Sequence, residues 1–230
     1  MLAVSDEVDE GLYADLGPVR AAKLIVACGD LPFEYLGYLM NGLDVPLVFV
    51  PGNHDADLSG YRSSRTGLTL RAGLPAAAPW PDGAVNADRR IVDVAGLRVA
   101  GLGGCRRYGS GPNQYSDRQL AGRARSLRRH AAWQRLRGGR RIDVLLTHAP
   151  PLGVGDASDP PHRGFAALHG LVAVLQPAVL LHGHVLRCDA ASPDRRLGRT
   201  AVRNVTGRHL LDIRPGGGTA DMQQGRRHAR

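Results

Sequence analysis

An apolar run over residues 48–50 stops at a Pro-Gly pair and is followed at once by Asn53, His54 and Asp55. Enzymes with α/β folds commonly build their sites where a buried strand ends in polar side chains. This run therefore favours a fold with a covered sheet, in which the end of one strand delivers three adjacent polar residues to a site.

Four other apolar runs end in polar residues of matching chemistry. Any one of these residues has an ordinary structural explanation, as a turn residue, a helix cap or a hydrogen-bonded histidine. The carboxyl ends of parallel strands, however, lie along one edge of a sheet, where ligands bind. The repeated pattern predicts a metal site, and mixed oxygen and imidazole ligands suit Mn, Fe, Zn or a similar divalent ion. The residues at these four ends are Asp6, Asp30, His148, and His182 with His184.

Apolar runs alternate with helical patterns along the first part of the chain, which predicts a parallel sheet covered by helices. Residues 24–28 are continuously apolar, as expected for a strand buried on both faces. The expected strands are 2–5, 24–28, 46–51, 90–94, 97–102, 142–146 and 178–181, and the expected helices are 10–22, 33–43, 117–137 with Asp117 as N-cap, and 165–175.

Three other segments lack this alternation. Residues 56–86 are rich in Gly, Pro, Ser and Ala, and we expect a long surface loop with a helical turn. Residues 200–205 and 209–213 are expected to form a terminal hairpin across Gly207. Residues 215–230 are rich in Gly and Arg and are expected to be a disordered tail, which leaves residues 1–214 as one domain.

The composition fits a single globular domain. The chain has 230 residues, of which 43% are apolar, enough for one substantial core. It has no run of about 18 apolar residues, so we expect no transmembrane helix and no membrane partner. Its three cysteines have no CxxC spacing, which indicates a reducing compartment and predicts a cytoplasmic location.

The chain is strongly basic, with a formal net charge of +9, and nearly all of its basic residues are arginines. Residues 118–141 contain many arginines and no acidic residue. We favour an exposed, solvated basic helix whose apolar residues pack inward. Contact with the phosphates of a nucleic acid is the alternative interpretation.

The polar strand ends together resemble the calcineurin-like metallophosphoesterase superfamily. The resemblance rests on Asp6, Gly29-Asp30, Gly52-Asn53-His54-Asp55, His148 and Gly183-His184, and it spans nearly the whole chain. Further stretches, such as Gly101-Leu102-Gly103-Gly104 and Thr147-His148-Ala149-Pro150, resemble a branch of small bacterial members whose activities are uncharacterised. The resemblance implies a four-layer α/β/β/α sandwich of two mixed β-sheets flanked by helices, with a metal site at the sheet edge.

The resemblance also implies two metal positions, and only one of them keeps all its ligands here. Val8 and Leu186 stand where the family has histidines, and Phe33 stands where it has a second aspartate. One or two divalent ions per chain are therefore expected. The first position would keep Asp6 and the shared Asp30, with Glu7, Asp9 or His182 as candidate substitutes; the second would be formed by Asp30, Asn53, His148 and His184.

The implied activity is hydrolysis of a phosphodiester or phosphomonoester by metal-activated water. His54 would protonate the leaving oxygen, with Asp55 as its orienting partner. Arg106, Asp156 and His162 are candidate contacts to a phosphorylated small molecule or nucleotide-like substrate. The alternatives are a catalytically weak or inactive relative that binds a phosphorylated ligand or partner, and a nucleic-acid-binding module.

Overall fold

The computed structural model describes residues 1–63, 68–186 and 195–216, and it has two large mixed sheets. The first has the order β16-β1-β2-β3-β7, parallel except for β16, which is antiparallel to β1. The second has the order β14-β15-β13-β12-β9-β8, with β8 and β14 antiparallel to their neighbours. The strands of the first sheet are β1 (Leu2–Ser5), β2 (Ile25–Ala27), β3 (Leu47–Phe49), β7 (Val85–Asn86) and β16 (Gly207–Leu210); those of the second are β8 (Ile91–Val94), β9 (Leu97–Leu102), β12 (Val144–Thr147), β13 (Val179–His182), β14 (Arg195–Leu197) and β15 (Thr200–Asn204).

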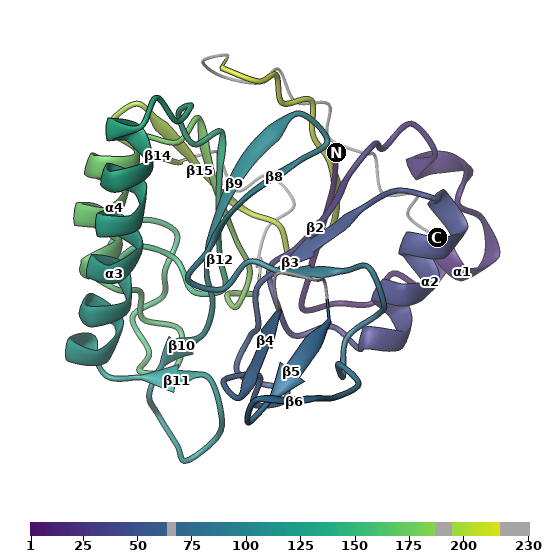
Figure 1. Ribbon diagram of the computed structural model, residues 1–230, viewed down its shortest axis with the longest axis horizontal. Coiled ribbons are helices and arrows are strands. Elements are labelled where there is room, and N and C mark those ends of the chain that lie inside the picture. The colour runs from purple at the N-terminus through teal and green to yellow at the C-terminus, as the bar shows by residue number, and fades with distance from the viewer. Residues whose placement is uncertain (64–67, 187–194, 217–230) are drawn as a thin grey trace.

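Helices cover the outer face of each sheet, so the four-layer α/β/β/α prediction is confirmed (Figure 1). Helix α1 (Gly11–Ala14), a 3-10 turn (Gly17–Val19) and α2 (Phe33–Leu43) pack on the first sheet. Helices α3 (Asp117–Leu136) and α4 (Ala167–Leu175) pack on the second. None of the described helices is long and apolar enough to cross a membrane.

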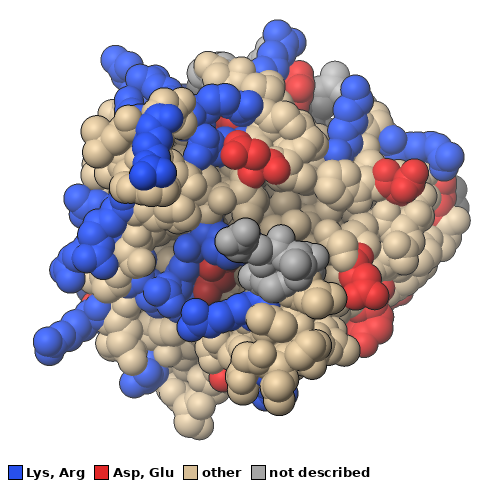
Figure 2. Space-filling model, viewed as in Figure 1, with Lys and Arg blue, Asp and Glu red and all other residues tan. Residues whose placement is uncertain are grey.

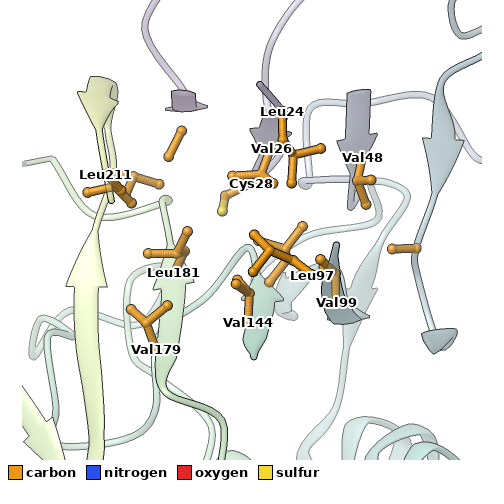
Figure 3. Packing of buried hydrophobic residues seen from close by; sticks show 14 of the residues in the cluster. Leu24, Val26, Cys28, Val48, Leu97, Val99, Val144, Val179, Leu181 and Leu211 are labelled. Carbon is orange, nitrogen blue, oxygen red and sulfur yellow. The ribbon is translucent and has the colours of Figure 1, made fainter. Parts of the chain in front are cut away.

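The core between the two sheets is built by strict alternation along the strands. Val26 and Cys28 of the β2 run face Val144 and Leu181 of the second sheet, as Figure 3 shows. Leu145 lies between two residues of this central cluster and points the other way, toward α3 and α4. Each strand therefore stabilises two layers at once, and strand ends from both sheets are held at one rim of the sandwich.

Two of the predicted elements are wrong in the structure. The expected helix over residues 10–22 is broken into α1 and the 3-10 turn, because Pro18 cannot continue an α-helical hydrogen-bond pattern. The expected terminal hairpin does not form, because β15 pairs with β13 in the second sheet whereas β16 pairs with β1 in the first. The segment around Val205 instead crosses from one sheet to the other.

Short strands form in two regions, mostly outside the main sheets. Residues 56–86 contain no helix within the described part, and instead form β4 (Tyr61–Ser63), β5 (Thr69–Arg71), β6 (Leu74–Pro75) and β7. The loop over residues 105–115 contains a two-stranded pair, β10 (Cys105–Arg106) and β11 (Gln114–Tyr115).

Three other predictions concern a helix cap, the cysteines and the C-terminal tail. The N-cap of α3 is Ser116 rather than Asp117, because Ser116 and Gln119 form a reciprocal capping box. Cys28 and Cys105 are buried free thiols. Cys188 and most of the predicted tail, residues 217–230, lie outside the described residues.

Candidate metal centre

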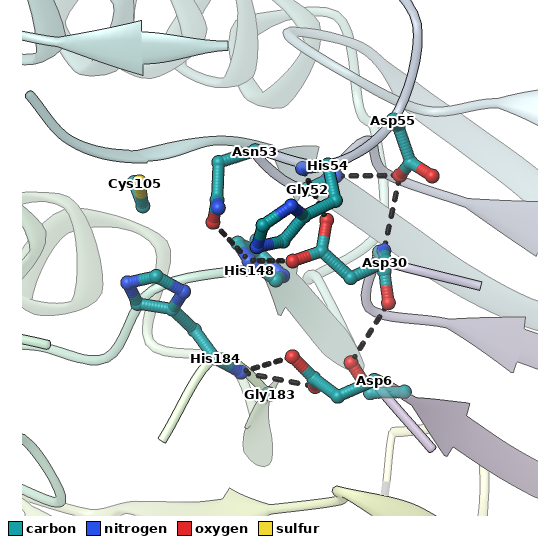
Figure 4. Close-up of polar contacts among 12 residues, drawn as sticks. Asp6, Asp30, Gly52, Asn53, His54, Asp55, Cys105, His148, Gly183 and His184 are labelled. Atoms are coloured by element: carbon teal, nitrogen blue, oxygen red, sulfur yellow. Dashed lines mark hydrogen bonds and ion pairs between the residues drawn. The ribbon is translucent and has the colours of Figure 1, made fainter. Parts of the chain in front are cut away.

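Five strand ends from both sheets meet at one rim of the sandwich (Figure 4). Three of the polar residues there, Asp6, Asp30 and His184, have positive φ angles of 61°, 58° and 67°. Side chains other than glycine seldom adopt this left-handed conformation, and it is concentrated at functional sites. The chain therefore turns sharply at these three residues, just after β1, β2 and β13.

Two glycines allow the loops to approach closely enough for this. A Cβ atom at Gly52 would overlap the Asp30 carboxylate, and one at Gly183 would overlap the Asp6 carboxylate. Because any larger residue would push these carboxylates away, the glycines explain why polar groups of different strands can converge.

His148 lies at the centre of the cluster and is fully buried. Its Nδ1 donates a hydrogen bond of 2.7 Å to the Cys28 carbonyl, which can only accept. Its Nε2 therefore carries a lone pair when the ring is neutral, yet it lies 2.9 Å from Asn53 Oδ1 and 3.2 Å from Asp30 Oδ2. Asn53 keeps its oxygen on this side because its Nδ2 donates to the Tyr108 hydroxyl at 2.9 Å. Three acceptor atoms thus face one another.

His184 completes this acceptor cluster. Its backbone N–H donates to both Asp6 carboxylate oxygens at 3.0 Å, and its Nε2 donates to the Pro161 carbonyl at 2.8 Å. The lone pair is therefore on Nδ1. The His184 ring centre lies 4.7 Å from that of His148, and one ligand atom from each of Asp30, His148 and His184 lies within 4.8 Å of the others.

The electrostatics of this cluster favour a positive charge at His148. Burial alone would lower the pKa of His148, but its hydrogen bond and charge interaction with Asp30 outweigh burial and raise it. Burial raises the pKa of Asp30, yet the His148 interactions outweigh it and the net pKa is lowered. Burial and the nearby His148 charge lower the pKa of His184 to about 4. A proton on His148 therefore holds the acceptors together, and a divalent cation fits the same place.

The comparisons with known proteins agree with this geometry. The family model for calcineurin-like phosphoesterases matches residues 7–188. The chain belongs to the calcineurin-like phosphoesterase family. This family carries out metal-dependent hydrolysis of phosphoesters, and the cluster at the rim is its candidate metal site here.

Solved structures support the fold assignment. One crystal structure aligns over 97% of both chains with a TM-score of 0.62 and 17% identity. TT1561 of Thermus thermophilus aligns with a TM-score of 0.55 and 16% identity, over 90% of this chain and 88% of its own. At this identity the likeness shows the fold alone. Among proteins with curated descriptions, the search found no match.

Asp6 and its neighbours form the other side of the centre. Asp6 reaches the rim, and burial raises the pKa of its carboxyl group. Val8, at a position where the sequence resemblance implies a histidine, packs against the apolar core beside α1 and α2. Leu186, at the other position where the resemblance implies a histidine, is 63% exposed to solvent. The structure therefore places neither side chain in the acceptor cluster.

The three candidate substitutes lie away from the cluster. Asp9 forms an ion pair of 3.0 Å with Arg208, and Glu7 is exposed. His182 is buried and donates to the Gly183 carbonyl, and its Nε2 faces the loop at Gly155. Burial lowers the pKa of His182 to about 4, so it is neutral at neutral pH.

His54 and Asp55 both lie at the rim, and Asp55 has a different role from the one expected. His54 is exposed, and its backbone N–H donates to Asp30 Oδ1 at 2.8 Å. Asp55 does not orient the His54 ring: its Oδ2 accepts the backbone N–H groups of Gly52 at 2.7 Å and Asp30 at 3.1 Å. Asp55 therefore ties the loops after β2 and β3 together.

Of the three candidate substrate contacts, only His162 lies beside the cluster. Its ring centre is 5.2 Å from that of His184, and its Nδ1 is 2.6 Å from the Asp159 carboxylate. Arg106 forms an ion pair of 2.8 Å with Asp117 at the start of α3. Asp156 accepts the Gly164 backbone N–H at 3.0 Å and braces its own loop.

Sequence reasoning missed two residues that support the site from the loop over residues 105–115. Tyr108 fixes the Asn53 amide by accepting its hydrogen bond. Asn113 donates to the carbonyls of Gly52, Asp55 and Ala56 and adopts a positive φ of 54°. The stretch Gly111-Pro112-Asn113 was a turn signal that could have drawn attention to this loop, but nothing in it names its distant partners.

Proposed function

We propose that the chain hydrolyses phosphodiesters or phosphomonoesters with one strongly held divalent ion, Mn, Fe or Zn, and that its first metal position is depleted. One observation carries the proposal: the acceptor atoms of Asp30, Asn53 and His148 converge at 2.9 and 3.2 Å, with no donor among them when His148 is neutral. Oxygen and imidazole ligands are the set that such ions take. With His184, these residues would form the strong metal site.

The depletion rests on what surrounds Asp6. Val8 is packed into the core, Leu186 is exposed, and Asp9 is neutralised by Arg208. Asp6 itself accepts the His184 backbone N–H. It would then act mainly by positioning His184, and a second ion would find only Asp6 and the shared Asp30.

Two histidines of the chain would act on the substrate beside the ion. A divalent ion supplies Lewis-acid activation of water and of the phosphoryl group. His54 lies at the exposed mouth with its backbone fixed by Asp30, so that its imidazole can donate a proton to the leaving oxygen. His162, with Nδ1 oriented by Asp159, presents Nε2 beside His184 and would contact the substrate. The basic surface favours a nucleotide-like phosphodiester over a monoester.

The test is hydrolysis of aryl phosphate monoesters and diesters with added Mn. We expect His54→Ala to lower kcat about a hundredfold, because general acid catalysis contributes about that much or more. His130→Ala on the exposed face of α3 is the matched control and should keep its activity. Equal and negligible rates for wild type and His54→Ala would sink the proposed hydrolase activity.

A second candidate function is binding of a phosphorylated ligand or partner with little or no turnover. It is favoured by the apolar residues at both missing histidine positions. With these ligands missing, a single ion would have to activate the water and bind the phosphoryl group. It predicts metal-dependent binding of a phosphate analogue by wild type and by His54→Ala alike. The hydrolase proposal instead predicts product release by wild type that falls about a hundredfold in His54→Ala.

A further inference from the structure

A basic hollow lies on the outer face of the second sheet, at the opposite end of β9 from the metal centre. It is bounded by α3, the end of α4 and the beginning of β9, and its cavity volume is about 110 Å³. Its charged lining is Arg98, Arg135, Arg140 and Arg141, and its apolar floor includes Ile142 and Leu175. We call this site the arginine hollow. Basic side chains also crowd the α3 side of the surface in Figure 2.

Arg98 enters the hollow because of strand alternation. Its neighbours Leu97 and Val99 point into the core between the sheets, so Arg98 points toward α3 and α4. Leu102 lies four positions further along β9 and pairs with Thr147 next to the metal centre. At about 3.3 Å per residue, the two sites are roughly 13 Å apart along the strand.

The Arg98 guanidinium is buried without a matching negative charge. Arg98 is only 9% exposed, its Nη2 donates to the Gln134 side chain, and its Nε has no hydrogen-bond partner among the described residues. Asp143 accepts the Arg98 backbone N–H and binds the Arg140 side chain instead. Asp93, opposite Arg98 on β8, forms no described ion pair with it. A buried cation in this state is costly.

The end of α3 compensates for this charge only in part. The α3 carbonyls near Gln134 contribute a partial negative charge of about half a unit, and Gln134 Oε1 is neutral. Arg135 and Arg141 add further positive charge around the same floor, and both are exposed. The lining therefore combines an excess of guanidinium groups, which suit planar oxyanions, with an apolar wall.

We propose that the arginine hollow binds a small organic anion, one whose phosphate or carboxylate group is attached to an apolar group. The oxyanion would lie against the guanidinium groups of Arg98 and Arg141, which both line the hollow. The apolar group would cover Ile142 and Leu175. This site is separate from the metal centre and does not depend on the proposed hydrolase activity.

The probe is phenylphosphonate, titrated calorimetrically into the full chain with and without a chelator. Arg98→Met and Arg141→Met should each weaken binding about tenfold, the loss expected when a charged hydrogen bond is removed. Arg118→Met, an exposed arginine at the other end of α3, is the matched control and should bind as wild type does. Inorganic phosphate and benzyl alcohol, which each lack one half of the probe, should bind at least tenfold more weakly.

Several results would overturn the proposal. Equal affinity in wild type, Arg98→Met and Arg141→Met would do so, as would loss of binding on chelation, which would place the probe at the metal centre. If inorganic phosphate bound as tightly as phenylphosphonate, the apolar wall would contribute nothing to binding. Because Arg98→Met removes a buried unpaired cation, its thermal midpoint without ligand should be no lower than that of wild type. Arg141 is exposed, so Arg141→Met tests the site without disturbing the core.

Discussion

The two sides of the metal centre are built from different strand ends at the same rim, and they differ in what supports them. On one side, Asp30, Asn53 and His148 are each fixed by backbone or side-chain hydrogen bonds and turn their acceptor atoms toward one point. On the other side, Asp6 accepts a backbone N–H, and Val8 packs against the apolar core. A metal position therefore depends on groups that fix its ligands as much as on the ligands themselves.

The largest effect should come from removing the shared carboxylate. Asp30→Asn keeps the shape of the side chain but removes the charge that draws a cation to His148. We expect metal affinity and hydrolysis to fall more than about a hundredfold, beyond the range seen for supporting residues. Metal affinity is measured by competition with a fluorescent chelator, and exposed Asp82→Asn serves as the control. Unchanged affinity would mean that the cluster is not the metal site.

The second prediction concerns a double variant that adds histidine ligands to the Asp6 side of the metal centre. Val8→His with Leu186→His returns imidazoles to both positions where the family has them. If depletion is due to these two residues alone, the double variant should bind one more ion per chain than wild type, as measured by elemental analysis. Val8→Ala with Leu186→Ala is the control and should not. A double-histidine variant with unchanged metal content would show that the Asp6 side lacks more than ligands.

The third prediction concerns pH and the intact side. A metal ion must displace the proton from His148, whose pKa is raised, whereas Asp30 and His184 have lowered pKa values and are already deprotonated near neutral pH. Metal affinity should therefore fall about tenfold per pH unit below the His148 pKa, beginning above about pH 6.5, and level off above it. Calorimetry across this range should show about one proton released per ion. A flat profile between about pH 5 and 7 would contradict the acceptor geometry.

The smallest effect is expected on the depleted side. Asp6→Asn keeps a hydrogen-bond acceptor for the His184 backbone N–H but loses the charge. If Asp6 mainly positions His184, metal affinity should fall about tenfold or less, the lower end of the range for supporting groups. The same chelator competition measures it. A loss as large as that of Asp30→Asn would make Asp6 a principal ligand.

The sequence predicted the sheet edge well because its signal is local. Each of the relevant apolar runs ends in its polar residue, and the carboxyl ends of parallel strands must share an edge. Local pattern alone therefore located Asp30, His148 and His184. The same local patterns could not say which sheet takes β15 and which takes β16, since both have strand-like alternation.

The predictions that missed depend on partners far away in the chain. Asp9 was a candidate ligand, but it pairs with Arg208, and the Arg106 side chain pairs with Asp117. Tyr108 lies 55 residues from the Asn53 amide that it fixes. No periodicity or motif in the sequence predicts such pairs, because they depend on how the loops pack in the tertiary structure.

The most direct measurement is the number of metal ions per chain, by elemental analysis of wild type and of Asn53→Ala. The account predicts one ion in wild type and none in Asn53→Ala, because the Asn53 oxygen faces His148 in the only position with a full ligand set among the described residues. Two ions in wild type would contradict the depleted position. No ion in wild type, or one that is retained in Asn53→Ala, would contradict a metal centre at this cluster.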